Sequence, residues 1–99
     1  MSWKDHKNEK VVLHGRVLSW EDAVRSVIDL ELRLRVSRGL NREESATWIY
    51  KSCRLSGIPF PKKASEIEEV CRELGFTIKH YSHAGGIRVY VTDQREKVQ

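Results

Sequence analysis

Residues 19–37 decide the class of this fold, because their apolar side chains fit two different periodicities. Those that gather on one side at helical spacing are Trp20, Ala23, Val24, Val27, Ile28, Leu30 and Leu34. The alternative is a strand over 28–36, where apolar residues alternate strictly. Acid–arginine pairs with the acid first at i,i+4 spacing favour a helix, and there are three: Glu21–Arg25, Asp29–Arg33 and Glu31–Arg35. We therefore predict a helix over 19–37 that ends at Arg38-Gly39.

Two more helices are predicted from capping patterns. Asn41 with Glu44 opens a helix that closes at Gly57. The core face of this helix is Ala46, Ile49, Tyr50 and Cys53. Ser65 with Glu68 caps another helix, which Gly75 stops. The apolar stripe of this last helix is Ala64, Ile67, Val70, Cys71 and Leu74. Two prolines make the intervening segment 58–61 an extended connector.

The remaining regular structure is predicted to be strand. Residues 11–18 are rich in β-branched side chains and predict one strand, with a bulge at Gly15. Residues 76–81 and 87–92 alternate and form a hairpin, whose turn needs positive φ angles at Gly85 and Gly86. The residues expected to point inward are Ile78, Ile87, Val89 and Val91. The fold class is therefore α+β: three helices packed on one small antiparallel sheet, in the order β-α-α-α-β-β.

The chain is long enough for a single domain. Its 99 residues predict one globular unit over 10–92 between frayed polar tails at 1–9 and 93–99. No apolar run reaches the roughly 18 residues of a membrane helix, and the start has no secretory character, so we expect a cytoplasmic protein. Eighteen Lys and Arg against fourteen Asp and Glu leave +4, which permits a nucleic-acid or acidic protein partner.

The outward face of the predicted hairpin is the first candidate site. It interleaves two aromatic rings with two cations: Lys79, Tyr81, Arg88 and Tyr90. Single-stranded nucleic acid needs this combination, because rings stack on bases and cations meet phosphates. The alternative is a solvated or helix-covered face stabilised by cross-strand pairs.

The charge distribution argues against a winged helix-turn-helix. Its recognition helix would be 64–74, which carries four Glu against one Arg and would be repelled by the phosphates of a major groove. The preceding stretch 41–63 has five cations against two acids. Its candidate nucleic-acid contacts are Lys51, Arg54, Lys62 and Lys63, with a solvated charged surface as the alternative.

A second class of function is open, namely a protein-interaction or structural module. Trp48 and Leu55 lie seven residues apart on a side of their helix away from its core face. They form either a second core contact or a partner-binding patch for a homodimer or another protein. The sequence thus leaves two alternatives, a nucleic-acid-binding accessory protein and an interaction module.

Metal binding and catalysis find no support in the sequence. His80 and His83 lie near the predicted turn with His14 on a neighbouring strand, but zinc needs partners at a second spacing. Cys53 and Cys71 lie on core faces as buried thiols, with a disulfide as the alternative. The chain has no nucleophile elbow, phosphate-cradling glycine loop or zinc-protease motif. We expect no enzyme activity, cofactor, metal or small-molecule substrate.

Asn and Gln are scarce in this charge-rich chain, which is typical of hyperthermophile proteins. We therefore expect a melting temperature above roughly 45–65 °C. With the Arg-Glu-Leu texture of 30–35 and the segment Gly85-Gly86-Ile87-Arg88-Val89-Tyr90, the chain resembles small proteins of unknown function from filamentous DNA viruses of hyperthermophilic archaea. The resemblance implies residence in the host cytoplasm or the virion, and it implies no activity.

Overall fold

Helix α1 (Trp20–Ser37) resolves the ambiguity of residues 28–36 in favour of helix. Ser19 Oγ accepts a hydrogen bond from Asp22 N at 3.2 Å and caps the first turn. The buried side of α1 consists of Trp20, Ala23, Val24, Val27, Ile28 and Leu32. The computed structural model describes residues 3–95, so residues 1–2 and 96–99 of the predicted tails lie outside the described residues.

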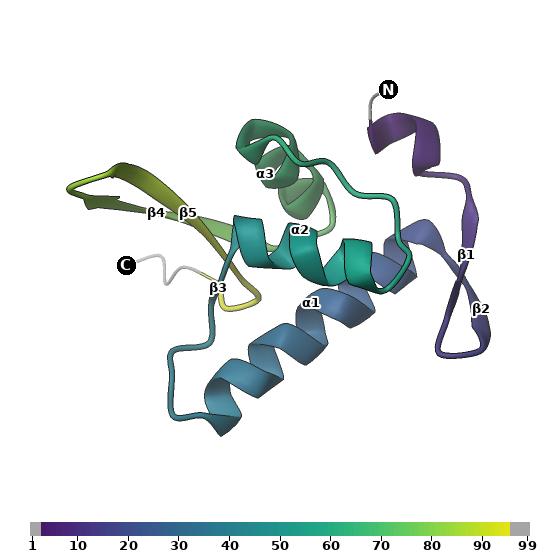
Figure 1. Ribbon diagram of the computed structural model, residues 1–99, viewed down its shortest axis with the longest axis horizontal. Coiled ribbons are helices and arrows are strands. Elements are labelled where there is room, and N and C mark those ends of the chain that lie inside the picture. Colours follow the sequence, from purple (N-terminus) through teal and green to yellow (C-terminus); the bar gives the residue numbers. More distant parts are fainter. Residues whose placement is uncertain (1–2, 96–99) are drawn as a thin grey trace.

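The described chain is α+β, as predicted, with three α-helices and two small antiparallel sheets (Figure 1). A 3₁₀ turn η1 (Trp3–His6) precedes strands β1 (Lys10–Leu13) and β2 (Arg16–Ser19). After α1 come β3 (Glu44–Ser45), α2 (Ala46–Leu55), α3 (Ala64–Glu73), β4 (Thr77–His83) and β5 (Gly86–Thr92). Strands β3, β5 and β4 form one sheet in that order.

The prediction of one strand at 11–18 within a single sheet was wrong. Strands β1 and β2 pair with each other, from Leu13 opposite Arg16 to Lys10 opposite Ser19. Two intervening residues with positive φ, His14 at 51° and Gly15 at 77°, reverse the chain. Such a two-residue turn matches the twist of paired strands, so Gly15 is a turn residue and not a bulge. Figure 1 shows this hairpin at the opposite side of the molecule from β4 and β5.

Both capping predictions for α2 and α3 were wrong, although their ends at Gly57 and Gly75 are confirmed. Residues 44–45 pair with β5 as β3, which leaves Ser45 to cap α2 by accepting from Trp48 N at 3.2 Å. Helix α3 begins after Lys63, with no side-chain cap bond, instead of after Ser65. Tertiary pairing therefore overrode the local capping pattern at 41–44.

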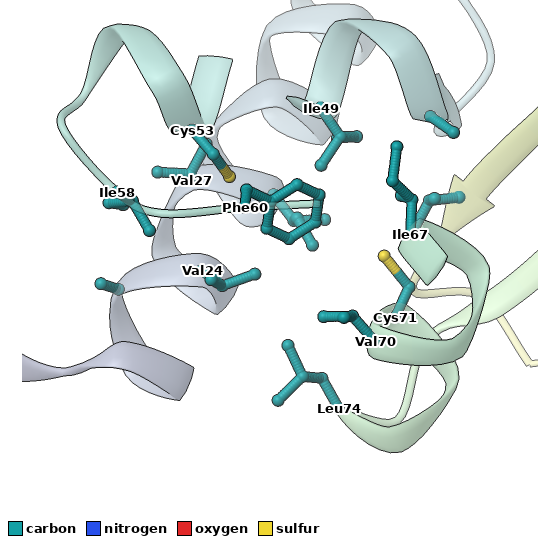
Figure 2. Close-up of a cluster of buried hydrophobic side chains, with 14 of the residues drawn as sticks. Val24, Val27, Ile49, Cys53, Ile58, Phe60, Ile67, Val70, Cys71 and Leu74 are labelled. Carbon is teal, nitrogen blue, oxygen red and sulfur yellow. The ribbon is translucent and has the colours of Figure 1, made fainter. Parts of the chain in front are cut away.

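The core lies among the three helices and the connector before α3. Figure 2 shows Val24 of α1, Ile49 of α2 and Val70 of α3 around Phe60. Trp20 Nε1 donates to the Pro59 carbonyl at 2.7 Å, which fixes the connector against α1. The buried cysteines Cys53 and Cys71 are both free. Burial raises the pKa of both thiols, that of Cys71 to about 12.

The apolar face of the β4–β5 hairpin is buried only at its base. Ile78 and Val91 lie opposite each other and are buried, whereas Val89 is half-buried and Ile87 is 69% exposed. The prediction that Ile87 points into the core was therefore wrong, and Ala64 of the α3 stripe is also exposed. For Ile87 the reason is visible in Figure 1, where the outer half of the hairpin extends away from the helices.

Candidate functional site

The polar face of the β4–β5 hairpin brings together the four residues that alternation predicts. Lys79 lies opposite Tyr90, and Tyr81 lies opposite Arg88, so all four side chains share one face. The tyrosine rings meet edge to face, with centroids 5.3 Å apart and an interplanar angle of 80°. The cross-strand ring pair stabilises the hairpin and leaves Tyr81 41% exposed.

A residue that sequence reasoning missed, Glu43, anchors the segment before β3 to this face. The Tyr81 hydroxyl donates to Glu43 Oε1 at 2.9 Å and Oε2 at 2.8 Å. Lys79 Nζ lies 3.4 Å from Oε2. Only 8% of Glu43 is exposed. The hydrogen bond to this carboxylate is the main cause that raises the pKa of Tyr81, followed by desolvation and the negative charges of Glu43 and Tyr90.

An open hollow of about 350 Å³ lies beside the tyrosine pair. Its lining residues come from α1, the segment before β3 and the hairpin, and they are Arg35, Glu43, Tyr81, His83, Arg88 and Tyr90. Three of the four predicted hairpin residues therefore line one hollow. Lys79 does not line it, but its Nζ lies 3.4 Å from Glu43, which does. The sequence predicts for Arg35 only a helical ion pair with Glu31, and no local spacing indicates that it lies beside the hairpin.

Arg35 and Arg88 make no ion pair within residues 3–95. The Nε of Arg35 is buried and has no hydrogen-bond partner. Glu31, the predicted partner of Arg35, accepts instead from Trp48 Nε1 at 2.8 Å and Ser52 Oγ at 3.0 Å. The hollow thus contains two guanidinium groups whose charges no carboxylate of the described chain neutralises directly.

His83 lies between two donors at the hairpin turn. Arg88 Nε–H donates to His83 Nε2 at 2.8 Å, and Gly85 N–H donates to His83 Nδ1 at 3.1 Å. Gly86 has the positive φ that the turn was predicted to need, at 122°, but the same prediction for Gly85 was wrong. A Cβ at Gly85 would lie 2.9 Å from the His83 ring, so its small size makes room for this contact.

The basic residues predicted in 41–63 lie outside this hollow. Lys51, Arg54, Lys62 and Lys63 are exposed, and within the described chain none of them makes an ion pair. Arg42, from the same stretch, is instead held by an ion pair within the fold, because its Nε and Nη2 each donate a hydrogen bond to Asp93 at 2.8 Å. The stretch therefore presents exposed cations that do not line this hollow.

Trp48 and Leu55 line a second hollow, of about 330 Å³, between α1, α2 and the β1–β2 hairpin. Its apolar walls are Leu13, Val27, Leu30, Trp48 and Leu55. Trp48 is fixed by its hydrogen bond to Glu31, whereas Leu55 is 86% exposed. The two residues are therefore not a second core contact.

The histidines do not assemble a metal site in the part of the chain that the structure describes. His80 Nε2 lies 3.2 Å from Glu68 Oε2, and His14 lines the second hollow. No group of three or more His, Cys, Asp or Glu side chains in residues 3–95 could hold a metal ion. Over the same residues, no helix has both the length and the apolar character needed to cross a membrane.

The two hollows differ in their chemistry. The hairpin hollow offers cations and aromatic rings, and the second hollow offers apolar walls. Searches against protein-family models, curated proteins and solved structures each found no significant match to this chain.

Proposed function

We propose that the protein binds single-stranded nucleic acid in the hairpin hollow. The observation that carries this proposal is the presence of two guanidinium groups without ion-pair partners in a hollow that also contains two tyrosine rings. Arg35 and Arg88 supply donors for phosphate oxygens, and the exposed ring of Tyr81 supplies a stacking surface for a base. Binding, and not catalysis, is the activity that these groups support.

The size of the hollow favours a single strand over a duplex. Its volume of about 350 Å³ is near the lower limit of ligand pockets, roughly 300–1,000 Å³, and so suits one nucleotide unit. A base can enter only when it is unpaired and turned out from its neighbours. If the chain is viral, as the resemblance implies, this binding would take place in the host cytoplasm or the virion.

Fluorescence anisotropy with a short labelled strand and its duplex tests the proposal between about 50 and 200 mM salt. We expect tighter binding of the single strand. Arg88→Ala should weaken that binding and lower the slope of log K against log salt by about one contact. Tyr81→Leu should weaken it about tenfold through lost stacking, with little change in slope.

Arg16→Ala is the matched control for the loss of charge. Arg16 is an exposed arginine of β2, makes no ion pair in the described residues, and lies at the opposite side of the molecule (Figure 1). If Arg16→Ala weakens binding as much as Arg88→Ala, the attraction is a general effect of positive charge and the proposed site is wrong. Arg54→Ala tests the separate basic stretch in the same way.

A second candidate function, self-association, is favoured by the shape of the surface around Leu55. This protruding side chain lies beside an apolar hollow on the same surface, as the self-complementary interface of a two-fold dimer requires. Sedimentation over a range of concentrations should then show a mass that rises with concentration. Leu55→Glu should remain monomeric, and a monomer at all concentrations in the unmodified protein would exclude this candidate.

A further inference from the structure

We infer that the hairpin hollow takes the phosphorylated end of a nucleic-acid strand in preference to its interior. This inference rests on the proposed function and specifies which part of a strand occupies the site. Three features of the hollow support it: its cations, the contact between Arg88 and His83, and the absence of an ion-pair partner for Arg35 among the described residues.

The charge around the hollow matches a dianion better than a monoanion. Two cations line it (Arg35 and Arg88) with the single carboxylate of Glu43, and a third, Lys79, lies beside that carboxylate. Lys79 lies at 3.4 Å from that carboxylate and offsets its charge, which leaves both guanidinium groups without a counter-ion. An internal phosphodiester brings one negative charge, whereas a terminal phosphate monoester brings about −1.5 to −2 at pH 7. A terminal phosphate therefore neutralises both arginines in one small volume.

The Arg88–His83 contact is one that an anion can replace with a stronger hydrogen bond. Both ring nitrogens of His83 face N–H donors, from Arg88 at 2.8 Å and from Gly85 at 3.1 Å. A neutral imidazole has only one nitrogen that can accept, because the other carries a proton. One of the two donors therefore lacks a true acceptor. A phosphate oxygen is anionic and is therefore a stronger acceptor for the Arg88 guanidinium than a neutral imidazole nitrogen.

Arg35 supplies the second half of the argument. It lines the hollow and makes no ion pair among the described residues, so its charge has no counter-ion there. A guanidinium satisfies several donors at once when it meets two oxygens of one phosphate in a fork. A terminal phosphate has three non-bridging oxygens, enough for two guanidinium groups, while an internal phosphodiester has two. The hollow's small volume also suits one end nucleotide better than a continuous strand.

The test compares one short strand in three forms: with a 5′-phosphate, with a 3′-phosphate and with neither. The label is placed on an internal base so that both ends stay available. We expect at least tenfold tighter binding of one phosphorylated form, and the form that gains affinity identifies the end. Inorganic phosphate at millimolar concentration should compete with that form and have a smaller effect on the unphosphorylated strand.

Arg88→Lys and Arg35→Lys keep the charge but remove the planar fork. Each should reduce the preference for the phosphorylated end, while Arg16→Lys should leave it unchanged. Circular dichroism verifies that each variant folds, and Arg88, on the exposed hairpin, keeps the test valid if Arg35→Lys does not fold.

Equal affinity for all three strands, together with weakening by Arg88→Ala, would overturn the end preference and leave the proposed function intact. A preference that persists in both lysine variants would also overturn the inference. The absence of binding to every strand at low salt would overturn both.

Discussion

The two ends of the β4–β5 hairpin share the same alternation of apolar and polar residues, but they differ in how much of the apolar face is buried. At the base, Ile78 and Val91 are buried against the helices, and Arg42 holds Asp93 with two hydrogen bonds of 2.8 Å. At the tip, Ile87 is exposed and Arg88 has no carboxylate partner in the described chain. The base therefore carries stability, while the tip presents charged groups that remain available to a ligand.

A pair of truncations on one face of the hairpin should give the largest difference in stability between its base and its tip. Ile78→Ala removes a buried side chain and should lower the free energy of unfolding by about 2–5 kcal/mol. Ile87→Ala lies on the same face near the tip and should change it by no more than about 0.5 kcal/mol. Urea unfolding curves measure both values. Similar losses in the two variants would show that the tip is packed in solution.

A smaller effect is expected at the Arg42–Asp93 pair. The hydrogen bonds from Arg42, aided by its charge, hold the pKa of Asp93 below its ordinary value of 3.8, against an opposing effect of desolvation. The stability that this carboxylate contributes is therefore present above pH 3.8 and is lost as the pH falls through its lower pKa in the folded protein.

Asp93→Asn should lower the urea midpoint at neutral pH and lose less stability than the unmodified protein on acidification below pH 4. Asp22→Asn is the control, because Asp22 makes only an exposed pair with Arg25 at 3.5 Å. An unchanged midpoint in Asp93→Asn at pH 7 would show that the pair adds nothing to the base of the hairpin.

The smallest effect concerns Tyr81, midway along the hairpin. Its hydrogen bond to Glu43 raises its pKa above the ordinary value of 10.0. Any stability from this hydroxyl is therefore present below pH 10 and is lost as the pH rises through the raised pKa. Ultraviolet titration should show a tyrosine transition above pH 10 that is absent in Tyr81→Phe and shifted down in Glu43→Gln. A titration that is the same in Glu43→Gln would contradict the observed hydrogen bond.

Local periodicity was sufficient to predict the helices and the polar hairpin face. The prediction that α1 is a helix was right, even though only one of the three expected ion pairs forms, that of Arg33 with Asp29 at 2.7 Å. Arg25 pairs with Asp22 instead, and Glu31 is used by α2. The apolar face therefore determined the helix, and the surface pairs adapted to their neighbours.

Glu43 and Arg35 could not be predicted, because their roles depend on contacts between distant parts of the chain. Glu43 and Tyr81 are 38 positions apart in the sequence, so the spacing of nearby residues does not indicate that they form a hydrogen bond. The capping pattern at Asn41 and Glu44 even pointed to a helix where β3 forms. Likewise, the β-branched run at 11–18 concealed the reversal at His14 and Gly15.

The short strand β3 also has a kinetic consequence. Its two residues join β5 across more than 40 positions of sequence, so this pairing must close a long loop before it gains any contact energy. The β4–β5 hairpin can form earlier from local contacts, but it holds only part of the hollow until β3 brings Glu43 to it. Ligand-binding competence should therefore appear late in refolding, after most helical signal has been recovered. A peptide of residues 76–92 alone should not reproduce it, since an isolated two-stranded hairpin is marginally stable and lacks Arg35.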